Sequence, residues 1–118
     1  DVLVIYDHVK EMINSGGEDI YPAEVENALM HHPDVIDAAA VGVPDDKWGE
    51  TVKGFIVLKK GSKVRESDLI AATKNLIASY KCPSSINFIT EMPRNPSGKI
   101  LRRELRAPFW EDGKRNVS

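Results

Sequence analysis

The chain has 118 residues, of which 42% are hydrophobic and 29% charged. This length suits one compact domain with a single core, and the composition excludes a disordered or fibrous protein. Sixteen Lys and Arg residues against eighteen Asp and Glu give a net charge of -2, so no overall positive field predicts binding to nucleic acid or to an anionic membrane.

Cys82 is the only cysteine of the chain. A single thiol excludes an internal disulfide framework and a multi-cysteine zinc site, and it favours a reducing compartment, so we expect a cytoplasmic protein. No apolar run approaches the roughly 20 residues that a membrane-spanning helix needs, and the N-terminus lacks a signal-peptide pattern. No metal-ligand spacing is found either, and we predict no metal site.

The N-terminal part predicts a β-hairpin. Val2 to Tyr6 has the composition of a strand, and because the sequence opens directly on this run we interpret the chain as an excised domain. Glu11 to Asn14 is expected to form a second strand. Gly16 and Gly17 follow as a tight reversal, since adjacent glycines tolerate positive φ.

The next element is a helix that begins near Pro22 and ends by Pro33, because proline fits the first helical position and stops a helix that reaches it. Glu24 and Glu26 stand two apart on this helix and therefore on different faces. They are not expected to form a paired-carboxylate acid/base site.

Strands and helices then alternate irregularly. Val35 to Val43 predicts a strand of small residues, Gly42 to Gly49 a turn-rich connection, and Thr51 to Lys59 a strand that is apolar on both faces. A helical spacing of apolar residues extends over Glu66 to Tyr80, and Ser85 to Thr90 predicts a further strand.

The C-terminal part predicts a loop over Pro93 to Gly98, a short basic helix over Lys99 to Arg106 and an irregular tail over Ala107 to Ser118. The complete order of elements predicts an α+β fold. We expect a small mixed or antiparallel sheet of about three main strands with flanking helices, together with the N-terminal β-hairpin.

Lys99 stands where the predicted loop meets the predicted helix. A cation gains nothing from the positive end of a helix dipole, whereas a bound phosphate or carboxylate would reverse this penalty. The alternative is a solvated surface lysine at the start of a basic helix. Arg102, Arg103 and Arg106 are interpreted as the solvated face of that helix, the alternative being contact with the phosphate of a ligand.

The glycine turn also permits two interpretations. It can be an ordinary hairpin turn, or a place where a ligand approaches the backbone closely because Gly16 and Gly17 lack a Cβ atom. Local spacing leaves both open.

Four stretches, taken in order, resemble the signature motifs of the C-terminal lid domain of adenylate-forming enzymes, a family of acyl-CoA synthetases, aryl-CoA ligases, luciferases and peptide-synthetase adenylation domains. The resemblance covers about residues 1–106, and residues 107–118 would be a tail. The four stretches are Asp7 to Glu26, Val41 to Glu50, Tyr80 to Pro83 and Pro93 to Lys99.

The resemblance implies a reaction in two halves. A carboxylic acid and ATP give an acyl-adenylate and pyrophosphate, and CoA then takes the acyl group. The resemblance makes Lys99 the catalytic lysine of the first half and places the turn at the pantetheine channel of CoA in the second half. The turn consists of Ser15, Gly16, Gly17 and Glu18.

His8 and Lys10 match family positions near the nucleotide, so the resemblance implies that they bind it. The family usually has arginine where this chain has His8, and some relatives have a lysine where it has Asn14. The second departure argues against the luciferase branch. The chain looks most like fatty-acyl or aryl-acid CoA ligases, with a fatty acid as the expected substrate.

The family's large domain, with its phosphate loop and acyl pocket, has no counterpart in this sequence. The expected partners are therefore that missing N-terminal domain, ATP with its Mg²⁺, CoA and a carboxylic acid, and the isolated chain is expected to be inactive. The alternative is a stand-alone, non-catalytic module that binds CoA, a carrier protein or a partner ligase. A further hypothesis is that acylation of Lys99 regulates the enzyme by removing its charge.

Overall fold

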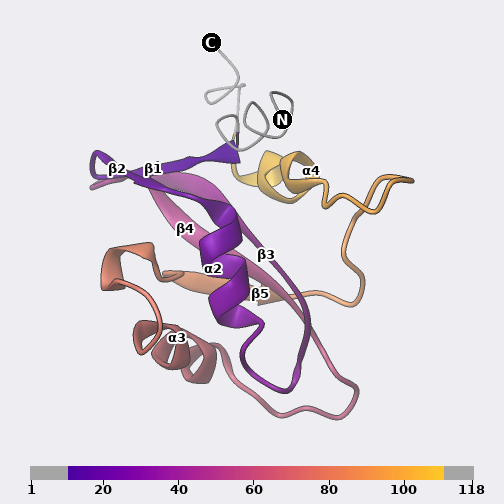
Figure 1. Cartoon of the computed structure of the whole chain (residues 1–118). Coiled ribbons are helices and arrows are strands. Elements are labelled where there is room, and N and C mark those ends of the chain that lie inside the picture. The colour runs from indigo at the N-terminus through magenta and orange to yellow at the C-terminus, as the bar shows by residue number, and fades with distance from the viewer. Residues whose placement is uncertain (1–10, 111–118) are drawn as a thin grey trace.

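The computed structural model describes residues 11–110. The strand predicted at Val2 to Tyr6 and the candidate residues His8 and Lys10 lie outside the described residues. Within them, a three-stranded sheet and a two-stranded hairpin are combined with helices on both sides of the larger sheet (Figure 1). The predicted α+β class is confirmed.

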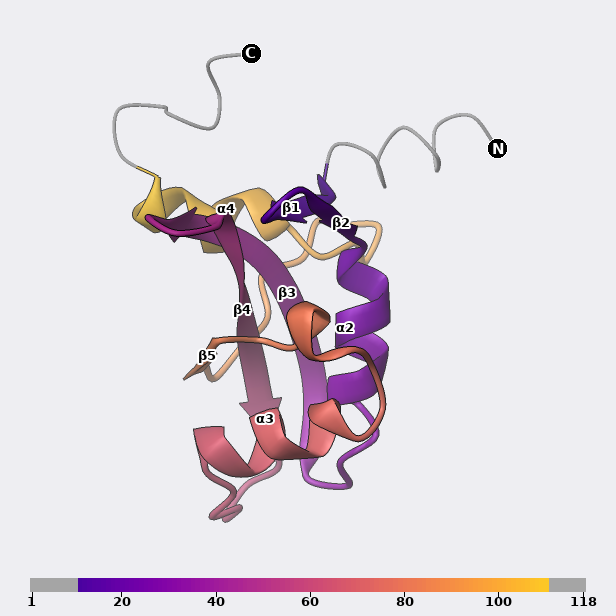
Figure 2. The same ribbon diagram turned by 90° about the vertical axis from the view of Figure 1, so that its left-hand side faces the viewer.

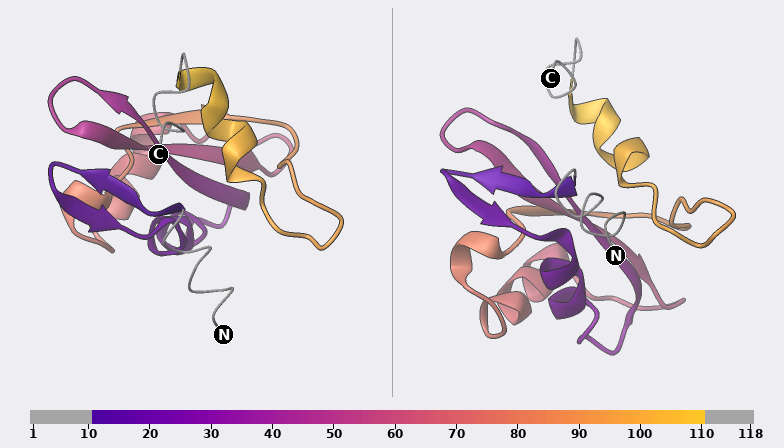
Figure 3. Two further views of the ribbon diagram at one scale, coloured as in Figure 1. Left: turned by 90° about the horizontal axis from the view of Figure 1, so that it is seen from above. Right: turned by 45° about the horizontal axis from the view of Figure 1, so that its top comes forward.

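The larger sheet is mixed, with the strand order β3-β4-β5. β3 (Val35–Asp45) pairs antiparallel with β4 (Gly49–Leu58), and β5 (Ser85–Phe88) pairs parallel with β4. The views in Figures 2 and 3 show α2 (Pro22–Leu29) and α3 (Glu66–Lys74) on one face and α4 (Arg102–Arg106) on the other.

Both faces of this sheet are apolar because both are covered. Side chains alternate along β3, so that Ala38 and Ala40 join the core beneath α2 and α3, while Ala39 and Val41 join a second core beneath α4. Small residues on β3 let α2 approach the strand closely. The prediction of a strand that is apolar on both faces is confirmed for β4, where Ile56 and Phe55 belong to different cores.

α2 begins with Pro22 at its first turn and ends at Leu29, before Pro33, as predicted. Its buried stripe contains Val25 and Leu29. None of the helices in the described part of the chain is long and apolar enough to cross a bilayer.

The helix predicted from Glu66 to Tyr80 is wrong at its C-terminal end. α3 stops at Lys74, where the N–H groups of Asn75 and Leu76 donate to carbonyls only three residues back, those of Ala72 and Thr73, a 3₁₀-type pattern that tightens the end of the helix. A short 3₁₀ helix, η1 (Ser79–Lys81), follows. Ile77 still packs against the core, so the apolar spacing reflected tertiary packing and not a continuous helix.

The connection predicted over Gly42 to Gly49 is shorter than expected. β3 continues to Asp45, which pairs with Gly49. The Asp45 carboxylate closes the turn by accepting the N–H groups of Lys47 at 3.1 Å and Trp48 at 2.8 Å. Turn-forming residues therefore occupy the end of a long strand, because one carboxylate satisfies the backbone donors of the tight turn.

The C-terminal segment differs from the prediction in two ways. α4 begins at Arg102 and not at Lys99. The described part of the tail is not irregular, because η2 (Ala107–Phe109) packs on the sheet, with the rings of Phe109 and Phe55 6.3 Å apart. Trp110 then donates its indole N–H to the carbonyl of Gly42 at 2.9 Å. These contacts extend the fold beyond the predicted end of the lid.

Candidate functional site

Lys99 lies in an exposed loop that a β-bridge between Arg94 and Ile100 closes. Asn95 and Lys99 exchange two hydrogen bonds, because the Lys99 N–H donates to Asn95 Oδ1 at 2.9 Å and the Asn95 N–H donates to the Lys99 carbonyl at 2.9 Å. Gly98 has a φ of 89°, a value that favours glycine. The loop therefore has a defined backbone.

The expectation that Lys99 stands at a helix N-terminus is wrong. The Leu101 N–H donates to the carbonyl of Pro93 at 2.9 Å, which keeps the chain extended until α4 begins at Arg102. The helix dipole therefore neither penalises Lys99 nor supplies an anion site beside it.

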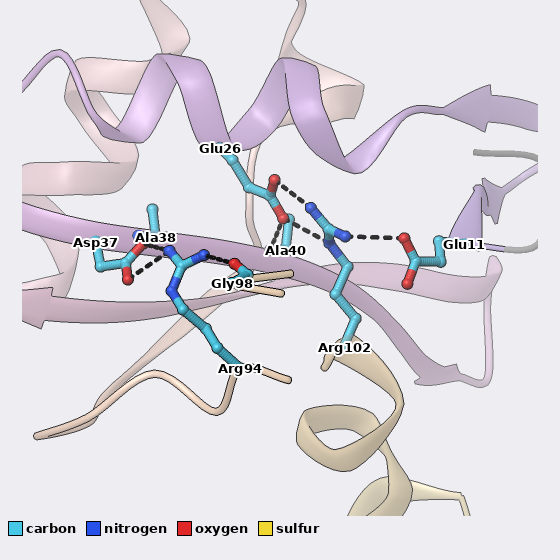
Figure 4. Close-up of polar contacts among 8 residues, drawn as sticks. All are labelled: Glu11, Glu26, Asp37, Ala38, Ala40, Arg94, Gly98 and Arg102. Atoms are coloured by element: carbon cyan, nitrogen blue, oxygen red, sulfur yellow. Dashed lines mark hydrogen bonds and ion pairs between the residues drawn. The ribbon is translucent and has the colours of Figure 1, made fainter. Parts of the chain in front are cut away.

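Arg94 joins this loop to β3 (Figure 4). Its Nη2 donates to Asp37 Oδ1 at 2.9 Å and Oδ2 at 2.8 Å, and its Nη1 donates to the carbonyl of Gly98. The Asp37 carboxylate is itself fixed, because its Oδ1 accepts the N–H of Ala38 at 3.0 Å. One guanidinium thus connects a strand of the sheet to the residue that precedes Lys99.

Arg102 lies in a second, more buried cluster (Figure 4). Its Nε and Nη2 donate to the two carboxylate oxygens of Glu26 at 2.8 and 2.6 Å, and its Nη1 donates to Glu11 at 2.8 Å. Glu26 also accepts the N–H of Ala40 at 2.9 Å. Burial works to lower the pKa of Arg102, but the bonds and charges of Glu26 and Glu11 outweigh it and raise that pKa.

The interpretation of Arg102 as part of a solvated face is therefore wrong, since its side chain is only 14% exposed. A signal for this cluster was present in the sequence. Glu26 falls on the buried stripe of α2, beside Val25 and Leu29, and a buried carboxylate requires a cation or several hydrogen-bond donors. Sequence spacing gave no indication of which cation would supply them.

Glu24 and Glu26 point to different partners, as their spacing predicts. Glu24 accepts a hydrogen bond from Lys81 Nζ at 2.9 Å, on the other side of the helix from Arg102. This bond raises the pKa of Lys81. The two carboxylates do not form an acid/base pair.

The glycine turn connects β1 (Ile13–Ser15) to β2 (Glu18–Ile20). The hairpin is confirmed, with its first strand shifted toward the turn relative to Glu11 to Asn14. The φ angles of Gly16 and Gly17 are 60° and 88°. The Gly16 N–H donates to the Trp48 carbonyl at 2.8 Å, and a Cβ on Gly16 would lie 2.7 Å from the Trp48 ring, so close packing also requires this glycine.

A groove of about 430 Å³ runs beside this turn. Ser15, Gly16 and Glu18 line it from the hairpin, and two half-exposed aromatic residues, Trp48 and Tyr80, line it from the β3–β4 turn and from η1. Its walls combine apolar rings with an open backbone, which suits a thin and partly apolar ligand.

The two candidate regions are not brought together. The Lys99 loop, which is the orange segment before α4, and the β1–β2 turn lie at opposite ends of the molecule in Figures 1 and 3. The two regions are therefore separate surfaces of one domain. Among residues 11–110, no three His, Cys, Asp or Glu side chains come together to hold a metal ion.

Residues 24–99, more than half of the chain, match the family of the AMP-binding enzyme C-terminal domain. The chain belongs to this family. The matched residues run from α2 to the Lys99 loop.

The relatives are ligases that are much longer than this chain. A fatty acid–[acyl-carrier-protein] ligase, ScoC, from Streptomyces coeruleorubidus is 48% identical over 97% of the chain, which spans 22% of that protein. Feruloyl-CoA synthase from an Amycolatopsis species is 46% identical over 89% of the chain, which spans 21% of its length.

Solved structures agree with this assignment. The fatty acyl CoA synthetase of Mycobacterium tuberculosis matches with a TM-score of 0.79 and 40% identity, over 86% of this chain and 20% of that one. ATP-bound MatB from Rhodopseudomonas palustris matches with a TM-score of 0.81 and 30% identity, over 86% of this chain and 20% of that one. The chain thus spans about a fifth of the relatives that it matches.

Proposed function

We propose that the chain is the mobile C-terminal domain of an acid–thiol ligase, which activates a carboxylic acid with ATP and transfers the acyl group to a thiol. The observation that carries this proposal is the placement of the Lys99 loop and the glycine turn at opposite ends of one rigid domain. Two half-reactions that need different residues can share one active site if the domain rotates between them.

Lys99 is proposed to act in adenylation. A carboxylate and the α-phosphate of ATP must be brought together, and negative charge develops on the phosphate oxygens. A lysine carried on an exposed, well-defined loop can enter a partly desolvated site, where its charge stabilises the transition state more than the separated reactants. The exposure of Lys99 and the closed backbone of its loop fit this role.

The glycine turn is proposed to act in thioester formation. Gly17 has open space around its Cα, with nothing within 4 Å of a Cβ built on it. A pantetheine arm can therefore pass the backbone closely, and the groove beside Ser15 and Trp48 extends its path. The proposed acyl substrate is a fatty acid.

The thiol is proposed to be that of CoA. A second candidate acceptor is the pantetheine thiol of an acyl carrier protein, which the 48% identity to the carrier-protein ligase ScoC favours. Both acceptors present the same arm to the turn. Comparing thioester formation with CoA and with a holo carrier protein distinguishes them.

The remaining machinery is proposed to belong to a large N-terminal domain, which would bind the acyl chain, ATP and the Mg²⁺ that accompanies it. His8 and Lys10 are proposed to contact the nucleotide near the junction. Finding a large adenylating domain encoded directly upstream of this chain would support this proposal. A start codon directly before Asp1 would instead support a stand-alone module that binds CoA, a carrier protein or a partner ligase.

The role of Lys99 is tested in the complete ligase by assaying adenylate formation and thioester formation separately. We expect Lys99→Ala to lower adenylation by about 10²–10³-fold, the usual loss on removing one group that stabilises transition-state charge. Thioester formation from supplied acyl-adenylate should be unchanged. Lys60→Ala, which removes an exposed lysine between β4 and α3, should alter neither step. Wild-type adenylation by Lys99→Ala would contradict the proposal.

The role of the turn is tested with a matched pair of glycines. Gly17 and Gly61 have φ angles of 88° and 86°, and a Cβ on either meets nothing within 4 Å. Alanine therefore strains the backbone equally at both positions. We expect Gly17→Ala to slow thioester formation while sparing adenylation, and Gly61→Ala to spare both. Equal effects of the two variants on thioester formation would contradict the proposed place of the turn beside the thiol channel.

A further inference from the structure

The loop that carries Lys99 has no apolar anchor of its own. Residues 94–99 contribute to neither core, although Met92 and Ile100 on either side of them pack beneath α4. Polar contacts must therefore fix the backbone at Lys99. An unanchored loop of this length loses considerable conformational entropy whenever it is ordered for reaction.

Asp37 is placed to provide such an anchor from the sheet. It follows an irregularity in the pairing of β3 with β4, between Val35 and Asp37. Bulges of this kind re-aim side chains, often beside active sites. Asp37 alternates with Ala39 and Val41 along β3, and so it faces the side of the sheet that the Lys99 loop crosses.

Arg94 links Asp37 to the loop. The guanidinium takes both oxygens of Asp37 with one nitrogen and the Gly98 carbonyl with another, as Figure 4 shows. The two residues are 57 positions apart in the sequence. A planar guanidinium can hold both acceptors at once, whereas a lysine ammonium is a point charge without that fixed geometry.

We propose that the Arg94–Asp37 pair positions the main chain of Lys99 for adenylation, and that Arg94 acts through this pair without touching the substrate. This inference rests on the proposed role of Lys99. The pair is partly exposed, with side-chain exposures of 41% for Arg94 and 23% for Asp37. Its loss should therefore leave the fold intact and be felt only where the loop position matters.

The test uses Arg94→Gln, Asp37→Asn and the double variant in the complete ligase, with both half-reactions assayed. Each single variant should lower kcat for adenylation by about 10- to 100-fold, the loss expected from a misplacement near 1 Å. KM for ATP and thioester formation from supplied acyl-adenylate should stay near wild type. The double variant should be no worse than the worse single one, because both remove the same interaction. Arg94→Lys should recover part of the loss.

The matched control is Arg65→Gln, which breaks another exposed Arg–Asp pair, that of Arg65 with Asp68 on α3. It should leave both half-reactions unchanged. The inference is overturned if Arg94→Gln adenylates normally, if it slows both half-reactions equally, or if Asp37→Asn has no effect while Arg94→Gln does. Lys99→Ala in the same assay distinguishes failure of the proposed function from failure of this inference. If Lys99→Ala adenylates normally, the proposed function is rejected. If Lys99→Ala loses adenylation while Arg94→Gln keeps it, only the positioning role of the Arg94–Asp37 pair is rejected.

Discussion

Arg94 and Arg102 hold the two sides of the Lys99 loop by the same kind of bond, but their surroundings differ. Arg102 is 14% exposed, and its partners Glu26 and Glu11 are 11% and 19% exposed. Arg94 is 41% exposed, so water and salt screen its charge. Removing Arg102 would leave two carboxylates poorly solvated, whereas removing Arg94 leaves one carboxylate close to water. The buried arginine should therefore determine the stability of the fold, and the exposed one the conformation of the loop.

The largest expected effect is that of Arg102→Ala. Breaking a buried ion pair by removing one partner costs about 3–5 kcal/mol, and we expect a loss of this size in the free energy of unfolding, measured with denaturant. Arg103→Ala, at an exposed neighbour on α4, is the control and should have little effect. Similar losses for the two variants would show that burial of the arginine does not determine its contribution to the free energy of unfolding.

The two acceptors of Arg102 should differ as well. Glu26 accepts bonds from Arg102 and also the N–H of Ala40, whereas Glu11 accepts from Arg102 Nη1. Because hydrogen bonds to charged groups contribute about 1.5–3 kcal/mol and neutral ones about 1, we expect Glu26→Gln to destabilise the domain more than Glu11→Gln. The same unfolding measurement tests this order. A larger loss for Glu11→Gln would show that Glu11, and not Glu26, is the more important acceptor of Arg102.

Arg94→Gln should reduce the free energy of unfolding by only ~0–1 kcal/mol, as exposed ion pairs do. High salt should shrink this difference further. Unfolding curves at low and high ionic strength give both numbers. A loss as large as that of Arg102→Ala would show that exposure does not separate the two arginines.

The smallest effect is expected for the exposed pair of Arg65 and Asp68. Hydrogen bonds from the backbone N–H and the side chain of Arg65 lower the pKa of Asp68. A lowered folded-state pKa stabilises the fold above the ordinary pKa of Asp, and this stabilisation is lost as the pH falls through the lowered value. The Tm difference between wild type and Asp68→Asn should therefore be small at neutral pH and vanish in acid. A difference that persists in strong acid would exclude the carboxylate as its source.

Much of the fold could be predicted from local patterns. Proline at the start of α2, the glycine pair between β1 and β2 and the apolar run of β4 each act through the backbone or through alternation, which neighbouring residues determine. The order of motifs also indicated the family, and with it the candidate role of the Lys99 loop. These features depend on residues that are close in the sequence.

Element ends were less predictable. The apolar spacing that continued past Lys74 came from residues that pack on the core outside the helix, and the start of α4 was misplaced because a bridge from Arg94 to Ile100 keeps Lys99 extended. In both places, long-range packing determined the backbone more strongly than local propensity did.

The sequence by itself determined the class of fold, the family and the two loops on which the proposed function depends, because each is encoded in short motifs. Only the tertiary structure decided what holds the Lys99 loop in place. Arg102 meets Glu26 across 76 positions and Arg94 meets Asp37 across 57, and no local pattern specifies such pairs. The same structure set the two loops at opposite ends of the domain, since strand pairing and helix packing, rather than order along the chain, determine which segments share a face.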